Sequence, residues 1–444
     1  MNKNGVIDLK RIIIHSDINH WFAQIEEMKN PSLKDVPMCV GGSEKGRHGI
    51  VVARNLKAKE YGVKTAETLR EAKRKCPGIK VVSPSYDDYH FYTEKVKDIY
   101  REYSDRVDSF GLDEAWIDIS DSWKLFVDKP LDLPKIIQDR VFNEIGLTVS
   151  IGVFWNKIYA KLGSDLIKPS GLVMISEGNY ESVVFPLPVE DLLMVGEATK
   201  KTLNNIGVVT IGDLARMPLD KAKSYLGKQG TMIWYYANGL DESDVSTVGY
   251  SEKPKSISNG TTPPDDINTL EEAKVIMTRL CESVALRTRN EELRGCVVSI
   301  NFRDTELKST VRQRRIDNYI DVSTDILKIA VELLELNHDF KIPLRRVIVG
   351  LSGLKNKDAV IDQITIYDAE EVKAAHREAQ IDKTIEDLRK RFGFKVIKRA
   401  NALLNEQTEN FNPNASKSVL PNSRNNKLMC LLNNKTFFFV KLLF

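Results

Sequence analysis

The chain has 444 residues, of which 42% are hydrophobic and 29% are charged. These values are typical of a folded globular protein, and the length predicts about three domains. No apolar run approaches the roughly 20 residues that cross a membrane, and the polar first ten residues do not resemble a signal peptide. We therefore expect a cytoplasmic protein with no membrane partner.

Cysteine and histidine are too scattered to predict a disulfide framework or a zinc site. There are five cysteines, with no CxxC spacing, and six histidines. Any metal would therefore be held by carboxylates, which favours a hard ion such as Mg²⁺. The net charge of +3 says little about partners, but the basic stretch 294–315 favours nucleic acid.

The first 170 or so residues predict alternating strands and helices. The β-branched run at 12–17 predicts a buried strand, and Asn19 is placed to cap a helix at 21–28. The other elements expected here are a strand at 50–52, a strand pair within 107–120 that turns at Gly111, a strand at 148–153, and a helix at 157–166 ended by Pro169. This alternation is typical of an α/β or α+β unit.

The rest of the chain predicts a helical region followed by a second small unit. Residues 192–214 are helical with glycine interruptions, and the polar stretch 246–264 reads as a linker. Then come a helix at 270–289, strands at 296–302 and 307–312, a helix at 320–336, a strand at 345–351, and a charged helix at 370–391. The Asn-rich composition near the end predicts disorder.

Three carboxylates carry the chemical hypothesis. Asp17 ends the first strand, and the pair Asp113 and Glu114 follows Gly111 at the start of another strand. Adjacent strands would bring the three acids to one end of a sheet, where they could hold Mg²⁺. Adjacent residues on a regular strand face opposite ways, so this requires the turn to twist the chain. The alternative is a set of turn carboxylates that face water.

Three segments give these residues a context: IIIHSDINHWFAQIEE, SFGLDEAWIDIS and SIGVFWNKIYAKLGSDLIKPSG. In this order they resemble the signature blocks of Y-family (translesion) DNA polymerases, most closely the UmuC-like ImpB/MucB/SamB branch of Gram-positive bacteria. The resemblance covers residues 10 to 395. It implies an α+β multidomain fold: a palm with a mixed sheet, small fingers, a helical thumb with a helix-hairpin-helix, and a separate α/β little finger.

The resemblance also implies domain limits. They are a palm at 10–170 with fingers inserted at about 23–80, a thumb at 171–240, a linker at 241–252, a little finger at 253–355, a clamp-binding-like peptide and charged helix at 356–400, and a disordered tail at 401–444.

The resemblance assigns roles around the carboxylates. Asp17 and Asp113 would bind two Mg²⁺ ions, with Mn²⁺ as a substitute, and the carbonyl of Ile18 would be a further ligand. Glu114 would be the catalytic glutamate and a metal ligand. Phe22 would be the steric gate, whose ring leaves no room for a 2′-hydroxyl on the incoming nucleotide. Its alternative is a core aromatic on an amphipathic helix.

Two lysines match positions that contact the triphosphate. Lys168 lies in a Lys-Pro-Ser-Gly turn, and Lys59 stands where relatives usually have arginine, so the bidentate fork is lost. Leu56 and Ala53 replace a customary tyrosine and threonine, and Asn19 stands where many relatives have aspartate. For both lysines the alternative is a solvated surface side chain.

Further positions match the family's DNA contacts. Gly196 and Gly207 fall in a helix-hairpin-helix pattern, where backbone N–H groups approach a phosphate. In the little finger, cations at Arg312, Arg314 and Arg315 would face the duplex along a strand. The alternatives are a glycine-punctuated helix turn and a solvated charged face.

A short peptide resembles the sliding-clamp motif of relatives: Gln363, Ile364, Ile366 and Tyr367, around Thr365. Its apolar side chains could fill a pocket on the clamp, although an ordinary edge strand is the alternative.

The hypothesis is therefore a template-directed DNA polymerase that performs low-fidelity translesion synthesis in DNA repair, with expression in an SOS-type damage response as a family expectation. Its partners would be primer-template DNA, deoxynucleoside triphosphates, the sliding clamp and, as a candidate, an accessory subunit. The alternatives are an inactive DNA-binding homologue on the same fold and a palm-type nucleotidyl cyclase.

Overall fold

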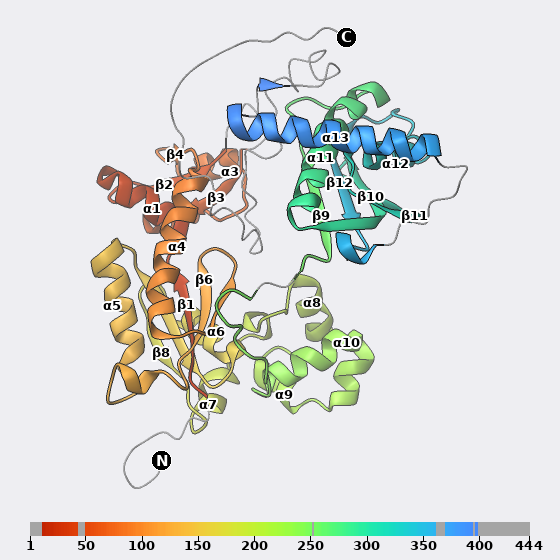
Figure 1. The fold of residues 1–444 in the computed structure, drawn as a ribbon. Helices are drawn as coiled ribbons and strands as arrows, with labels where there is room; N and C mark the ends of the chain where they lie inside the picture. The colour runs from red at the N-terminus through yellow and green to blue at the C-terminus, as the bar shows by residue number, and fades with distance from the viewer. Residues whose placement is uncertain (1–10, 43–48, 251–252, 361–368, 394–395, 398–444) are drawn as a thin grey trace. The chain divides into compact units, whose positions relative to one another are not determined.

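The structure, a computed structural model, describes residues 11–42, 49–250, 253–360, 369–393 and 396–397. The chain divides into two compact units, one ending at residue 250 and one formed by the residues that follow (Figure 1). The proposed clamp peptide and the tail at 401–444 lie outside the described residues. Among the helices that are described, none is both long and apolar enough to cross a membrane.

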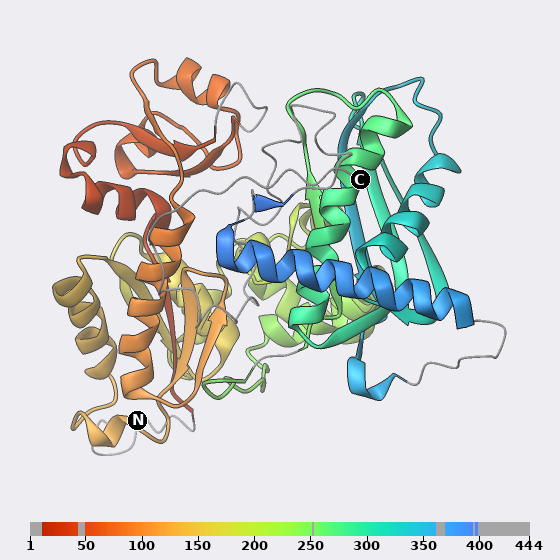
Figure 2. The same cartoon turned by 45° about the horizontal axis from the view of Figure 1, so that its top comes forward.

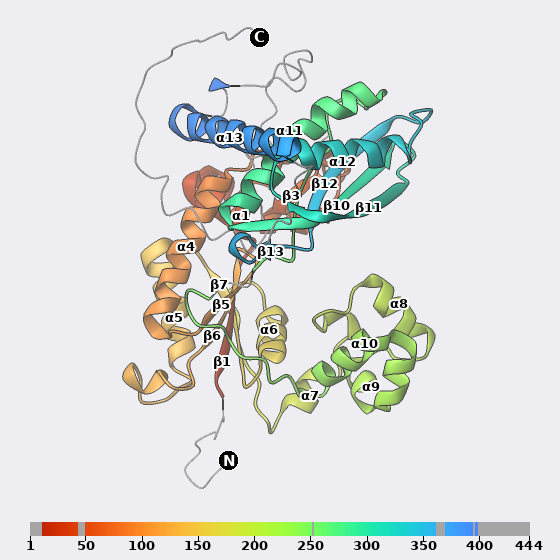
Figure 3. The same cartoon turned by 45° about the vertical axis from the view of Figure 1, so that its right-hand side comes forward.

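A five-stranded mixed sheet is the centre of the first unit. Its order is β5-β6-β1-β7-β8, antiparallel except for the parallel pair β7–β8. The strands are β1 (Ile13–Ile18), β5 (Val107–Phe110), β6 (Glu114–Asp118), β7 (Val149–Phe154) and β8 (Leu172–Met174). Helices α4 (Tyr86–Tyr103) and α5 (Leu133–Ile145) cover one face, and α6 (Lys157–Leu166) covers the other (Figure 3). All of the strands and the helix predicted here are confirmed within a few residues.

The alternation of side chains along β1 explains the two covered faces. Ile14 and Ile18 pack in the core with α4 and α5, and Ser16 on the same face hydrogen-bonds Tyr100 of α4 at 2.7 Å. The intervening residues turn toward α6, where His15 meets Ser164. Because side chains alternate with period two, Asp17 lies on the α6 face as well.

A smaller sheet and three helices form the region inserted after β1. The sheet has the order β3-β2-β4, built from β2 (Met38–Gly41), β3 (Val51–Arg54) and β4 (Lys80–Val82). The helices are α1 (Trp21–Lys29), α2 (Leu56–Glu60) and α3 (Leu69–Lys75). The buried Asn55 joins them, because its side chain accepts from Met38 N and Ala58 N and donates to Glu27.

The predicted cap on α1 is wrong. His20 is the residue before the helix, in a left-handed conformation with φ 34°, and it makes no side-chain cap. The Asn19 amide instead donates to Thr148 Oγ1 at 3.0 Å and accepts from Ser150 Oγ at 2.7 Å. Asn19 thus fastens the β1–α1 turn to β7.

Four helices follow β8: α7 (Tyr180–Val184), α8 (Glu197–Asn205), α9 (Ile211–Arg216) and α10 (Leu219–Ala237). Gly207, at φ 82°, makes the turn out of α8, and Thr210 with Asp213 forms a capping box on α9. Short 3-10 turns occur at Pro31–Leu33, Trp123–Leu125, Val189–Asp191 and Lys357–Ala359.

The segment after α10 is fastened to the sheet. Val248 N donates to Asp105 O at 2.7 Å, and Thr247 forms a bridge with Arg106. The first part of the predicted linker therefore extends the edge of the first unit.

The second unit is a four-stranded antiparallel sheet of order β11-β10-β12-β9 with helices on one face. Its elements are β9 (Ser256–Thr261), α11 (Leu270–Asn290), β10 (Leu293–Asp304), β11 (Ser309–Ile320), α12 (Ser323–Glu335), β12 (Leu344–Ser352) and β13 (Lys355–Asn356), which pairs with β10. The predicted helices and central strands are confirmed. The prediction of linker for 246–264 is wrong where β9 pairs with β12.

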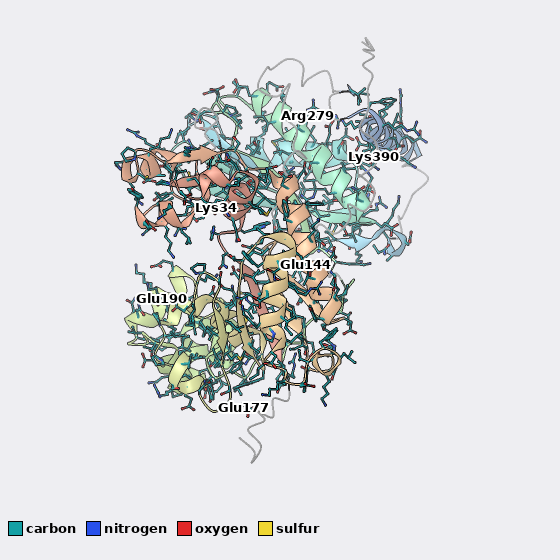
Figure 4. All side chains as sticks on the ribbon, turned by 90° about the vertical axis from the view of Figure 1, so that its left-hand side faces the viewer. Lys34, Glu144, Glu177, Glu190, Arg279 and Lys390 are labelled. Atoms are coloured by element: carbon teal, nitrogen blue, oxygen red, sulfur yellow. The ribbon has the colours of Figure 1, made fainter. Side chains whose placement is uncertain are left out.

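The predicted charged helix forms α13 (Ala369–Phe392), which lies across α11 and α12 (Figure 2). Asp382, only 4% exposed, accepts from Ser323 N at 2.9 Å and from its hydroxyl at 2.8 Å, at the start of α12. Arg389 donates to Glu282 of α11 at 3.1 Å. Figure 4 labels Arg279 on α11 and Lys390 on α13.

Close backbone contact between β7 and α6 gives a stability prediction. A Cβ on Gly152 would lie 2.0 Å from Ala160 O and 2.4 Å from Ser164 N. We expect Gly152→Ala to lower the free energy of unfolding by about 3 kcal/mol, because backbone cannot yield as a side-chain tip can. Urea unfolding followed by tryptophan fluorescence measures this, with Gly78→Ala as control because its Cβ would meet open space. Equal effects of the two substitutions would contradict the prediction.

Candidate active site

Three carboxylates meet at the end of the β1–β6 pair. Asp17 is directly opposite Glu114 in the antiparallel register. Asp113 precedes β6 in a turn entered through Gly111, at φ 79°, and its carbonyl accepts from Ile18 N at 3.0 Å. Asp113 therefore lies just outside the regular strand, so the alternation of β6 does not fix the direction of its side chain. The register and the turn place the three acids at one end of the strand pair, and their role as a metal site stays a prediction.

Two lysines, one in α6 and one just after it, form ion pairs with the carboxylates. Lys168 Nζ lies 2.7 Å from Asp17 Oδ2 and 2.8 Å from Asp165 Oδ1. Lys161 Nζ lies 2.6 Å from Glu114 Oε2. With Asp113, four carboxylates face two ammonium groups, so the site has a surplus of negative charge.

Burial and the neighbouring charges shift the pKa values of these acids. Burial, together with the charges of Glu114 and Asp113, raises the pKa of Asp17 to about 7, against the opposing effect of Lys168. Burial and the charge of Glu114 also raise the pKa of Asp113. Glu114 differs: although burial opposes it, the hydrogen bond from His15 and the charge of Lys161 lower its pKa to about 2.

The donor set fits a hard divalent cation, although it is not arranged as a finished coordination sphere. Among the described residues, no group of three or more His, Cys, Asp or Glu is placed to hold a metal at once. Lys168 and Lys161 form ion pairs with oxygens of Asp17 and Glu114 that a cation would bind. A cation would offset the burial and the repulsion that raise the pKa of Asp17 and Asp113.

Phe22, the predicted steric gate, lies on α1, the helix that follows β1. Its ring is 6% exposed, stacks on Tyr89 with centroids 4.2 Å apart, and meets Tyr86 edge-on at 5.9 Å. The Tyr89 hydroxyl donates to Glu26 at 2.7 Å. The ring is thus held in one place, which both the steric-gate and the core-aromatic interpretations require.

The second predicted triphosphate lysine has a different setting. Lys59 is exposed on α2, and Leu56 on the same helix is 41% exposed. The structure brings Lys168 to the carboxylates and leaves Lys59 on the surface of the inserted region.

The two predicted phosphate-contact glycines are accessible. Gly196 precedes α8 and Gly207 follows it, both are exposed, and a Cβ on either would meet nothing within 4 Å. Met194, in the turn before Gly196, has φ 71°, and its carbonyl accepts from Gln229 of α10 at 3.0 Å. These turns offer backbone amides with no side chain in the way.

The three arginines of β11 divide between the two faces of its sheet. Arg312 and Arg314 pair with Ile300 and Val298, whose side chains are in the core beneath the helices. Accordingly, Arg314 forms an ion pair with Glu332 of α12 at 2.6 Å, and Arg312 donates to Asn337 at 2.7 Å. Arg315 is on the opposite face.

Sequence reasoning did not identify three residues that touch the acids or support them: His15, Lys161 and Ser164. His15 Nε2 lies 3.2 Å from Glu114 Oε2, and its Nδ1 lies 2.8 Å from Ser164 Oγ. The alternation of β1 gives one signal, because His15 must share a face with Asp17. The helical spacing of Lys161 and Ser164, i and i+3, gives another.

Comparison with known proteins identifies two matched family regions. Residues 16–165 match the impB/mucB/samB family, and residues 254–366 match the impB/mucB/samB family C-terminal domain. Among curated proteins, DNA polymerase IV of Acetivibrio thermocellus is 39% identical over 391 residues, which cover 88% of this chain and 97% of the relative. DNA polymerase IV 1 of Bacillus subtilis is 32% identical over 401 residues, covering 90% and 95%.

Solved structures share the fold. A Y-family DNA polymerase chimera, Dbh-Dpo4(243-245)-Dbh, matches with a TM-score of 0.68 and 21% identity, covering 77% of this chain and 98% of that one. An insertion ternary complex of Dbh DNA polymerase matches with a TM-score of 0.55 at the same identity and coverage.

The repulsion among the acids predicts an effect of metal on stability. Because the pKa of Asp113 is higher in the folded chain than its ordinary value, folding free energy is lost as the pH rises and this group ionises. At pH 7.5 without metal, Asp113→Asn should therefore raise the melting temperature. Excess Mg²⁺ should stabilise the wild type, by about 2.7 kcal/mol at a hundredfold excess over Kd, and the variant much less.

Differential scanning fluorimetry with EDTA and with Mg²⁺ makes this measurement. The exposed Asp128→Asn is the matched control and should respond to Mg²⁺ as the wild type does. A variant that gains as much from Mg²⁺ as the wild type would place the cation elsewhere.

Proposed function

The chain belongs to the impB/mucB/samB family of Y-family DNA polymerases, and from this we propose that it copies damaged templates by two-metal nucleotidyl transfer at Asp17, Asp113 and Glu114. It is a DNA-directed DNA polymerase that performs translesion synthesis. The observation that carries the proposed site is the strand register that sets Asp17 opposite Glu114 beside the Asp113 turn. No finding supports an inactive homologue, because all three acids are present and converge.

Polymerases of this family depend on metal, and for this chain we propose two Mg²⁺ ions, with Mn²⁺ as a substitute, because the proposed ligands are carboxylates. When bound, the ions would activate the primer 3′-hydroxyl and neutralise charge on the leaving pyrophosphate. Asp17 and Asp113 would both bind the two ions, with Glu114 and the Ile18 carbonyl as further ligands. Glu114 would lie beside the primer 3′-hydroxyl.

The lysines partly neutralise the carboxylates of this site. In the ligand-free chain Lys168 pairs with Asp17. With a metal held by Asp17, Lys168 would be free to reach the triphosphate through its flexible stem. Burial opposes the charged form of Lys168, but the carboxylates of Asp17 and Asp165 raise its pKa, so it remains cationic for this role.

Nucleotide selection follows from the fixed ring of Phe22. Stacking on Tyr89 prevents the ring from withdrawing, so a 2′-hydroxyl arriving above it would meet carbon instead of space. Lys59 would approach the triphosphate as a point charge. Leu56 and Ala53 offer no hydroxyl there, which predicts weaker nucleotide binding with the metal site intact.

The nucleotidyl cyclase alternative explains less of the chain. It accounts for the carboxylates but leaves the exposed glycine turns at Gly196 and Gly207 and the entire second unit without a role. Primer-template DNA accounts for both.

The open face of the second sheet is the better DNA surface of that unit. It lies opposite α11 and α12 and contains the cross-strand pair Arg303 and Arg346 together with Arg315. Arg312 and Arg314 are directed to α12 and are engaged there. Phosphate contacts would therefore depend on Arg315 more than on its two neighbours.

Protein partners rest on the resemblance alone. The sliding clamp would take the peptide formed by Gln363, Ile364, Ile366 and Tyr367, and an accessory subunit is a further candidate. These residues lie outside the described part of the chain.

Primer extension tests the proposed reaction. With an undamaged primer-template, Mg²⁺ and four deoxynucleotides, the wild type should extend the primer, and Asp113→Ala should reduce the rate by at least about 1000-fold, because one metal ligand is lost. Asp128→Ala should extend normally. A wild type that binds the substrate but adds no nucleotide, even with a sliding clamp, would contradict the catalytic proposal. The DNA-binding alternative would then be favoured.

The division of the arginines gives a second test. Arg315→Ala should weaken binding of primer-template DNA and lower the slope of log K against log salt by about 1, because one phosphate contact is lost. Arg314→Ala, matched in charge and strand, should change the slope much less. Fluorescence anisotropy across a salt series measures both, and equal slopes for the two variants would reject the assignment of faces.

A further inference from the structure

One buried side chain joins α1 to the region inserted after β1. Asn55, only 1% exposed, is the residue before α2. Its side-chain amide donates to Glu27 Oε1 on α1 at 2.9 Å, and to the carbonyl oxygens of Val36 at 2.9 Å and Leu33 at 3.3 Å. Of these three acceptors, the carboxylate of Glu27 is the charged one, and hydrogen bonds to charged groups are the stronger kind. The bond from Asn55 to Glu27 is therefore a strong direct link between α1 and the start of α2.

The orientation of the Asn55 amide follows from its partners. Its oxygen accepts from Met38 N of β2 at 3.1 Å and from Ala58 N of α2 at 2.9 Å. A flipped amide would set its N–H groups against these two N–H donors and its oxygen against the three acceptors. The amide nitrogen is therefore directed at Glu27, and the amide oxygen caps α2.

Lys59 is attached to Asn55 through the backbone. Its N–H donates to Asn55 O at 3.0 Å, and Asn55 N donates to Met38 O at 3.1 Å. The helix α2 has five residues, too few to be stable without its surroundings, so its position depends on the cap and on the strand to which the cap is bonded. A displacement of Asn55 would therefore displace Lys59 as well.

The other end of the link lies on the helix that carries Phe22. The helix α1 packs against β2 and β3 (Figure 1), and Phe22 shares one apolar core with Met38 and Val40 of β2. Apolar contacts are not directional, so this core alone permits small shifts of the inserted region along α1. The hydrogen bond from Asn55 to Glu27 is directional and favours one position.

We propose that Asn55 and Glu27 are positioning residues for the incoming nucleotide: their hydrogen bond holds α2, and with it Lys59, at a fixed place relative to the Phe22 ring. This rests on the proposed polymerase function, in which Lys59 approaches the triphosphate and Phe22 meets the sugar. Asn55 and Glu27 act through those two side chains, as hydrogen bonds behind a binding site do in other proteins.

Substitutions at both ends of the bond separate positioning from packing. Glu27→Gln keeps an acceptor for the Asn55 amide, whereas Glu27→Leu removes the acceptor. The amide would still have two carbonyl acceptors for its two hydrogens, so the leucine variant should fold. Glu27→Leu also removes a contact with His20 Nε2 at 3.5 Å, which Asn55→Asp leaves in place. Asn55→Asp keeps the cap on α2 but turns an oxygen toward Glu27.

Rapid-quench single-nucleotide insertion over a range of nucleotide concentrations is the measurement. Glu27→Leu and Asn55→Asp should each raise the nucleotide Kd about 10-fold with the maximal rate changed less than about threefold, and Glu27→Gln should stay within about twofold of the wild type. Glu177→Leu, at an exposed glutamate after β8 (Figure 4), is the matched control and should insert normally. An unchanged Kd in Glu27→Leu, or a Glu27→Gln as impaired as Glu27→Leu, would overturn the proposal. If Asn55→Asp does not fold, the two Glu27 variants decide.

A double-mutant cycle tests the route of the effect. Lys59→Ala should itself raise the nucleotide Kd, and adding Glu27→Leu should raise it little further, because the lysine that the bond positions is already gone. Losses that multiply independently, or a Kd that Lys59→Ala leaves unchanged, would contradict positioning through Lys59.

Hydrogen exchange of the backbone amides gives a readout apart from activity. The amides of Ala58 and Lys59, which donate to Asn55, should exchange at least about fivefold faster in Glu27→Leu than in the wild type or Glu27→Gln. Equal exchange in all three proteins would overturn the inference even in an active polymerase. If the wild type inserts no nucleotide yet the exchange is as expected, the proposed function fails, while the link between α1 and α2 stands.

Discussion

The antiparallel register of β1 against β6 is the constraint on which the site depends. It sets Asp17 against Glu114 and, through the following turn, brings Asp113 to the same end. A slip of one residue would turn the odd-numbered side chains of β1 into the apolar layer under α4 and α5. The slip is opposed from both faces, because Ile14 would leave the core and His15 would leave Ser164.

Negative charge accumulates at this site and is the second constraint on it. Buried acids repel one another, and folding tolerates them only because lysines from one helix and its following turn lie against them. The buried acids therefore lower the free energy of unfolding, which is the usual compromise between stability and chemistry at a functional site.

Much of this architecture follows from local pattern in the sequence. The β-branched run before Asp17, the turn at Gly111 and the spacing of α6 predict their elements within a few residues. The convergence of the acids also follows, given that two strand ends meet. β9 was not predicted because Ser256–Thr261 is polar and has no strand signature of its own, and it becomes a strand only by pairing with β12. Asn19 resembles a cap but bonds across to β7, a partner 130 or so residues away.

Long-range pairings set the limit of such reasoning. The spacing of Arg312, Arg314 and Arg315 shows that they alternate, but not which set the helices will cover. That depends on the side of the sheet to which α12 returns. In the same way, the contact of His15 with Glu114 depends on the register of β1 against β6. The sequence of either strand alone predicts only which side chains share a face of the sheet.

The contact between α13 and α12 sets the smallest fragment in which the second unit is intact. The family's C-terminal domain ends at residue 366, but Asp382 supplies the acceptor for the backbone amide and hydroxyl of Ser323. A fragment cut at the family boundary would expose the first turn of α12 and leave Glu282 without Arg389. The helix beyond the boundary is thus part of the folding unit, and a truncation that appears conservative by homology would remove a capping residue from its core.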